Sequence, residues 1–183
     1  MASPMQLFEA LEKAEPAPAL NWGLSFARGY LELGMIKEAE RELDKLSIRY
    51  RCYADVLEMR VRVFMAAGKM AKAARLAKSA AKVYPGVAEF YLLAARAYEA
   101  MRRPDRAKEV WVSAPSLFHV SGVFHYNLAR FEAQLGNPRS AREHIALAIE
   151  LDPKIRNRVA GDPGLRALMD PEAASDAEAE AQA

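Results

Sequence analysis

The sequence is short of the features that mark secreted and membrane proteins. Its 183 residues include one cysteine, Cys52, so no disulfide can form within the chain and a reducing compartment is expected. Four charged residues near the start interrupt any apolar run of a signal peptide: Glu9, Glu12, Lys13 and Glu15. No stretch of the sequence approaches the roughly 20 uncharged residues that span a bilayer. We therefore expect a cytoplasmic protein without a membrane span.

The sequence also lacks the residue groupings that catalysis and cofactor binding need. The three histidines do not share metal-ligand spacing; we place His119 in a linker and expect His144 to face solvent. The thiol of Cys52 has no histidine near it in sequence, as is typical of an inert cysteine. Together these absences predict a protein that is not an enzyme, with no metal site and no cofactor.

Charge is divided unevenly between the body of the chain and its end. Residues 170–183 carry five acidic residues and no basic one. Removing those five from the 24 acidic residues leaves 19 against 26 basic residues, so the rest of the chain has a net charge of +7. The end consists largely of alanine and acidic residues without bulky apolar side chains, a composition that predicts disorder. A basic body favours an acidic partner.

A period of 34 residues runs through the middle of the sequence. Ala141 is preceded at this interval by Ala107, Ala73 and Ala39, and Ala129 by Ala95, Val61 and Ala27. Gly136 is preceded by Arg102, Gly68 and Gly34. A fixed period of this length indicates a stack of helix pairs. The small residues assigned to the helix crossings are Ala27, Ala39, Ala73, Ala95, Ala107, Ala129 and Ala141.

Apolar residues at helical spacing lie on both sides of each turn position. The first pair is predicted as helices over about 21–33 and 36–48, with Asn21 as the N-cap and Gly34 in the turn. A short amphipathic helix is predicted before it, over residues 4–14, with Met5, Phe8 and Leu11 on one face.

These residues resemble the tetratricopeptide repeat family over residues 20–153. The resemblance implies an all-α fold: a right-handed superhelical solenoid of antiparallel helix pairs. It predicts four repeats, over 20–53, 54–87, 88–121 and 122–155. Stack ends need caps, and we assign an N-terminal capping helix and linker to 1–19, a C-terminal capping helix to 154–169 and a disordered acidic tail to 170–183. Three positions depart from the pattern: Arg102 replaces a turn glycine, Pro115 shortens a helix, and Glu132 replaces Tyr or Phe.

Four arginines share the period: Arg28, Arg62, Arg96 and Arg130. The resemblance implies that first helices line a concave groove, where arginine would bind carboxylates. Pairing with Glu32, Glu58 and Glu99 on the same helices is the alternative for the first three. Arg130 has no such neighbour, so we predict that it holds an acidic or C-terminal carboxylate, aided by Tyr126 and Asn127.

The sequence therefore predicts a protein-interaction scaffold or adaptor that binds a peptide or partner protein. A secretion-type chaperone and a nucleic-acid-binding helical repeat are the alternatives. A nucleic-acid-binding repeat would need base-reading side chains at the same place in every repeat. The residues three positions before the arginines instead vary: they are Ser25, Met59, Leu93 and Asn127. This variation disfavours nucleic acid as the partner. A basic stripe, Lys72, Arg75, Lys78 and Lys82, is interpreted as a solvated helix face. Self-association stays open.

Overall fold

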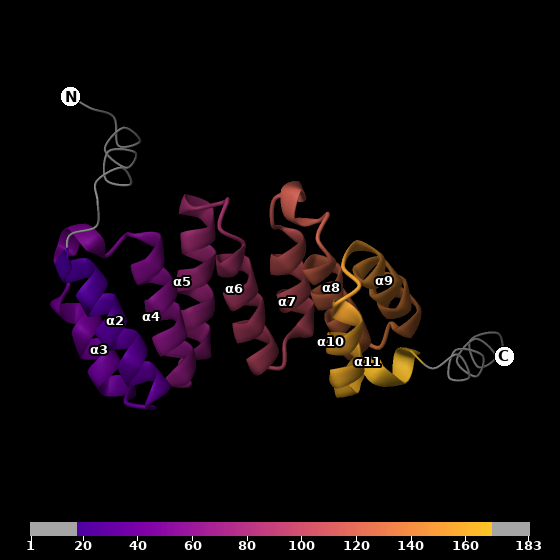
Figure 1. Cartoon of the computed structure of the whole chain (residues 1–183), viewed down its shortest axis with the longest axis horizontal. Coiled ribbons are helices and arrows are strands. Elements are labelled where there is room, and N and C mark those ends of the chain that lie inside the picture. The colour runs from indigo at the N-terminus through magenta and orange to yellow at the C-terminus, as the bar shows by residue number, and fades with distance from the viewer. Residues whose placement is uncertain (1–17, 170–183) are drawn as a thin grey trace, which may run out of the picture. The chain divides into compact units, whose positions relative to one another are not determined.

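The computed structural model describes residues 18–169, and within that part of the chain all regular elements are helical (Figure 1). The longer helices are α2 (Pro18–Glu32), α3 (Ile36–Lys45), α4 (Ala54–Ala66), α5 (Met70–Val83), α6 (Ala88–Ala100), α7 (Pro104–Val112), α8 (Gly122–Gln134) and α9 (Pro138–Leu151). The shorter ones are α10 (Ile155–Gly161), α11 (Pro163–Arg166) and the 3-10 turns η1 (Ile48–Tyr50), η2 (Ser116–Phe118) and η3 (Ala167–Met169). The all-α prediction is confirmed for these residues. The predicted helix over 4–14 and the acidic tail lie outside them.

The chain forms two compact units, Met1–Lys69 and Met70–Ala183. In the first unit α2 packs against α3 and α4 around a core that includes Leu20, Leu43 and Val56. In the second unit each of α5 to α8 packs against the next helix in the chain. First and second helices of the predicted pairs therefore follow one another along the chain, as the 34-residue period predicts. The division into four repeats stays a prediction.

The seven alanines assigned to helix crossings are fully buried. Each of Ala27, Ala39, Ala73, Ala95, Ala107, Ala129 and Ala141 has 0% of its surface exposed. A methyl group at these places lets two helix backbones approach closely, while larger side chains fill the space beside them. A larger residue at such a place would overpack the core, which destabilises a protein by about 1–3 kcal/mol.

The same hydrogen-bonded turn closes all four first helices. The residue after the turn position donates its backbone N–H five residues back, as in Met35 to Tyr30, Lys69 to Phe64, Arg103 to Tyr98 and Asn137 to Glu132, at 2.8–2.9 Å. This is the bonding of a Schellman motif, whose central residue adopts positive φ. That residue is glycine in three turns, with φ of 71° to 77°, and Arg102 in the fourth, with φ of 59°.

We predict that Arg102→Gly stabilises the protein. An L-residue in the left-handed region is destabilised by about 1–2 kcal/mol, while glycine loses roughly 0.5–1 kcal/mol through the unfolded chain. The net effect should be a rise of several tenths of a kcal/mol in the unfolding free energy, measured by urea titration. The reciprocal change Gly136→Arg should destabilise the protein; a gain from Gly136→Arg would contradict this explanation.

Two helix starts show how local chemistry sets the element boundaries. The prediction that Asn21 caps the first helix is wrong, because α2 already includes Pro18, whose fixed φ suits the first turn of a helix. Asp162 is the N-cap of α11, since its Oδ1 accepts from the Gly164 N–H at 2.9 Å.

The segment after α9 differs in form from the one capping helix expected over 154–169. It consists of α10, α11 and η3, because Pro163 lacks the N–H that would continue α10 and instead begins α11. Ile155, Val159 and Leu165 are fully or almost fully buried and join the core formed by α8 and α9. The segment is therefore an integral part of the second unit.

Candidate functional site

The four arginines of the 34-residue period lie on the first helix of each predicted pair. Arg28 and Arg62 lie on α2 and α4 of the first unit, and Arg96 and Arg130 on α6 and α8 of the second. Each follows a residue with no exposed surface, namely Ala27, Val61, Ala95 or Ala129. A helix turns about 100° per residue, so each arginine leaves its helix beside the buried crossing.

Arg28 is exposed and lines a polar pocket of about 230 Å³ in the first unit. The other lining residues are Asn21, Leu24, Ser25, Asp55, Glu58 and Met59. No ion pair joins Arg28 to any residue within 18–169, so the expected pairing with Glu32 is absent there. The pocket thus presents one guanidinium together with hydroxyl, amide and carboxylate groups.

Arg62 forms the ion pair that its helix spacing predicts. Its Nε lies 2.8 Å from Oε1 of Glu58, one helical turn earlier on α4. Both side chains are partly exposed, so the contribution of the pair to stability is small, about 0–1 kcal/mol. Arg62 is therefore already engaged by an acidic group of its own helix.

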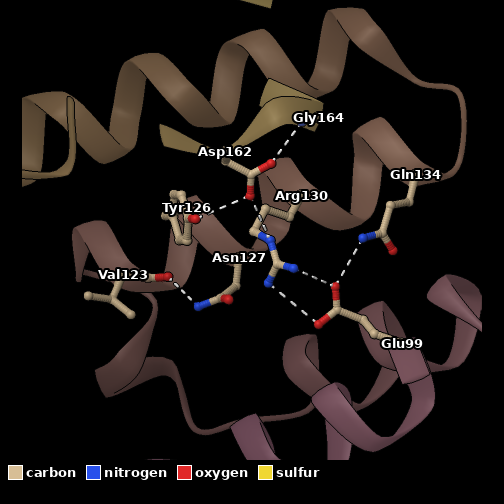
Figure 2. A network of polar contacts seen from close by, with 8 residues as sticks. All are labelled: Glu99, Val123, Tyr126, Asn127, Arg130, Gln134, Asp162 and Gly164. Carbon is tan, nitrogen blue, oxygen red and sulfur yellow. Dashed lines mark hydrogen bonds and ion pairs between the residues drawn. The ribbon is translucent and has the colours of Figure 1, made fainter. Parts of the chain in front are cut away.

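Arg130 is the most extensively paired of the four arginines, as Figure 2 shows. Its Nη2 lies 3.1 Å from Oε1 of Glu99 on α6, and its Nε lies 3.1 Å from Oδ2 of Asp162 in the segment after α10. The Tyr126 hydroxyl donates to the same Asp162 oxygen at 3.3 Å, and Gln134 Nε2 donates to Glu99 at 3.0 Å. We call these five residues the Arg130 network.

Arg130 has no acidic partner on its own helix, as the sequence predicts, but it has two on other elements. Its partners lie 31 and 32 residues away in sequence and on other elements, so spacing along α8 does not show them. Glu99, assigned from sequence to Arg96, pairs with Arg130 instead. Arg96 is exposed and has no ion pair with another residue in the described part of the chain.

The side chains of Tyr126 and Asn127 are also buried. Asn127 is 3% exposed and its Nδ2 donates to the Val123 carbonyl at 2.9 Å, within α8. The Tyr126 ring is covered by the guanidinium of Arg158, 4.5 Å from the ring centre. Burial and the adjacent Asp162 carboxylate raise the pKa of the Tyr126 phenol. Arg130 and Tyr126 are therefore engaged within the Arg130 network and Asn127 within α8, while the carboxylate site expected at these three residues stays a prediction.

The Arg130 network should contribute measurably to stability. Hydrogen bonds to charged groups contribute about 1.5–3 kcal/mol each, so Arg130→Met should lower the unfolding free energy by roughly 2–4 kcal/mol because it leaves two partly buried carboxylates unpaired. Arg28→Met is the matched control and should change stability by less than about 0.5 kcal/mol. Urea unfolding measures both. Equal losses from the two variants would contradict a structural role specific to Arg130.

Glu132 is a second buried acidic group that the sequence marked as unusual. It is 4% exposed and pairs with Lys108 Nζ of α7 at 2.6 Å, while Asn137 Nδ2 donates to it at 2.9 Å. Burial raises the pKa of the carboxyl, but the bonds from Lys108 and Asn137 outweigh it and leave the pKa below its usual value. An ion pair between α7 and α8 thus stands at the position where the other pairs have Tyr30, Phe64 or Tyr98.

Two histidines meet between α8 and α9. His125 Nδ1 and His144 Nδ1 are 3.2 Å apart, and the rings are stacked. The expectation that His144 faces solvent is wrong, because it is half-buried against His125. Burial lowers the pKa of both imidazoles, and His125 lowers that of His144 further. His119, Lys108, Glu132 and Glu143 supply the nearby charges.

The histidine pair predicts a fall in stability below neutral pH. Histidine in the unfolded chain has a pKa of about 6.5, so once the pH drops below that value the unfolded state binds more protons than the folded state. The unfolding free energy should therefore fall between about pH 7.5 and 5.5. His144→Gln should flatten this dependence in urea titrations at both pH values. The same slope in wild type and His144→Gln would overturn the assignment to this pair.

The described residues contain no group of three or more His, Cys, Asp or Glu side chains placed to hold a metal ion. Among the same residues, no helix combines the length and apolar character required to cross a membrane.

Two family models described as "Tetratricopeptide repeat" match the chain, over residues 64–116 and 124–155. The fold is similar to that of a thermophilic TPR protein from Thermus thermophilus, with a TM-score of 0.64 and 21% identity, covering 86% of this chain and 87% of that chain. It is also similar to the MamA protein, with a TM-score of 0.62 and 17% identity, covering 75% of each chain. No curated protein matches the chain.

The alternating helices, the shared turn and the buried alanines define a helical repeat protein. The two family matches make the assignment more specific: residues 64–116 and 124–155 match models of the tetratricopeptide repeat. Tetratricopeptide repeats in general form scaffolds for protein interaction.

Proposed function

We propose that this chain is an adaptor that binds a peptide or partner protein, with Arg28 in the first unit and Arg96 in the second as contacting cations. The observation that carries the proposal is the division of the four arginines into two that are paired and two that are exposed. Arg62 and Arg130 are held by Glu58 and by Glu99 and Asp162. Arg28 and Arg96 form no ion pair with another residue among 18–169 and retain their donors for a ligand.

An acidic ligand fits these two arginines. A guanidinium presents a planar set of donors that matches a carboxylate and cannot lose its charge near neutral pH. At Arg28 the pocket adds Ser25 and Asn21, which can bond a peptide backbone, and Asp55 and Glu58, which exclude a ligand with dense negative charge. The ligand class is therefore a peptide with single, spaced carboxylates.

Burial argues against a nucleic-acid-reading helical repeat. Of the four places beside the arginines, Met59, Leu93 and Asn127 are 5%, 2% and 3% exposed. Side chains that read bases must reach the base edges, and these three are enclosed by their own units. Protein binding needs no such periodic readout. No catalytic role is proposed for any residue.

Site-specific photocrosslinking tests the proposed contact. A benzoylphenylalanine at position 25, in the Arg28 pocket, should form adducts with a partner protein in cells, whereas one at exposed position 37 on α3 should not. Arg28→Glu or Arg96→Glu should reduce the adducts by about tenfold or more, since a charge-assisted bond contributes roughly 1.5–3 kcal/mol.

Arg75→Glu is the matched control for this experiment. It makes the same charge change at an exposed place on α5, in the basic stripe interpreted as a solvated face. Adducts that survive Arg28→Glu and Arg96→Glu, or that disappear equally with Arg75→Glu, would reject the two arginines as the contact. Unfolding midpoints of all three variants identify any loss that comes from misfolding.

A further inference from the structure

Helix α5 of the second unit presents a row of cations on its outer side. The row is the basic stripe, whose members are all exposed: Lys72, Arg75, Lys78 and Lys82. Their spacings of three, three and four keep them on one side of the helix, over a length of about 15 Å. The opposite side of α5 consists of buried alanines, so the stripe is the surface that this helix offers to other molecules.

The second helices of the other predicted pairs balance their exposed cations with acids. Their ion pairs join residues three or four apart: Arg41–Glu38 and Lys45–Glu42 on α3, Arg106–Glu109 on α7 and Arg139–Glu143 on α9. Helix α5 contains no acidic residue, and no ion pair joins the basic stripe to any residue within 18–169. Like charges one helical turn apart repel each other. A solvated helix face in this chain would show the mixture of its counterparts, so the single sign of α5 indicates an anionic partner.

We propose that the basic stripe is an electrostatic contact for an anionic lipid bilayer. Three of its four cations are lysines, whose ammonium groups are compact charges without the fixed fork of a guanidinium. Such groups suit a surface dense in anionic headgroups, where binding requires no fixed geometry. Four Lys or Arg side chains along one amphipathic helix are typical of this contact, and each strengthens the attraction by about fivefold.

The composition of α5 disfavours other anionic partners. The helix contains no aromatic residue, and Ser79 is the other exposed residue between Lys72 and Lys82. Protein interfaces centre on aromatic and other large apolar side chains, and single-stranded nucleic acids stack on aromatic rings. A bilayer surface requires neither feature. The contact is also independent of the peptide binding proposed for Arg28 and Arg96, because it involves neither residue.

Vesicle flotation with the full chain tests the proposal without any peptide. The affinity for vesicles of phosphatidylserine and phosphatidylcholine should exceed that for phosphatidylcholine alone by several hundredfold, since four cations contribute about fivefold each. Molar salt should remove the difference, because it shortens the screening length to about 3 Å. Equal binding to the two kinds of vesicle, or binding to neither, would overturn the proposal.

Charge reversal shows whether the stripe makes the contact. Lys78→Glu with Lys82→Glu should weaken binding to the anionic vesicles by about thirtyfold or more. The control, Lys37→Glu with Arg41→Glu, makes the same change in net charge at exposed places on α3 and should weaken it by less than about threefold. Equal losses would show that net charge is responsible and would reject the stripe.

Two further measurements complete the experiment. Lys78→Gln with Lys82→Gln should weaken vesicle binding by about 25-fold, and unfolding midpoints of all variants identify any loss that comes from misfolding. Single-stranded RNA and polyglutamate are the competing polyanions. Binding of the wild type to either one more tightly than to the anionic vesicles, with the same loss in Lys78→Glu with Lys82→Glu, would overturn the bilayer and assign the stripe to that polyanion.

Discussion

The full burial of alanines that recur at the 34-residue period is the constraint on which the other features of this chain depend. The seven alanines assigned to helix crossings have no exposed surface, so a larger side chain there should overpack the core. These alanines recur at the 34-residue period, and the same Schellman hydrogen bond closes the turn after each first helix. Each arginine directly follows a buried residue of its helix. Helix packing therefore fixes the position of each arginine backbone.

The four arginines recur at the same 34-residue interval, but their side chains have different partners. Glu58 holds Arg62 within one helix, and Glu99 and Asp162 hold Arg130 across three elements. The segment after α9 supplies Asp162 and buries Ile155, Val159 and Leu165, so the pairing of Arg130 and the closure of the second unit are one arrangement. Arg28 and Arg96 keep exposed guanidinium groups. Variation in the acidic neighbours thus determines which of the four arginines are paired and which are exposed.

Most of the helical framework could be predicted from sequence because it follows from local rules. Helical spacing predicted the helix pairs, and the glycine period predicted the turns. The partners of Arg130, the Lys108–Glu132 pair and the His125–His144 contact were missed because each joins different helices. Such contacts depend on how helices are rotated about their axes and on side-chain rotamers, neither of which a repeat period specifies. Glu132 was the one departure in sequence that marked such a contact.

The division between paired and exposed arginines is tested most directly by NMR of the arginine Nε–Hε groups during addition of a peptide that carries single, spaced glutamates. The Hε resonances of Arg62 and Arg130 should be protected from exchange with water and unchanged by the peptide, because their carboxylate partners are already in place. The resonances of Arg28 and Arg96 should shift as the peptide is added. A shift at Arg130, with none at Arg28 and Arg96, would contradict the account.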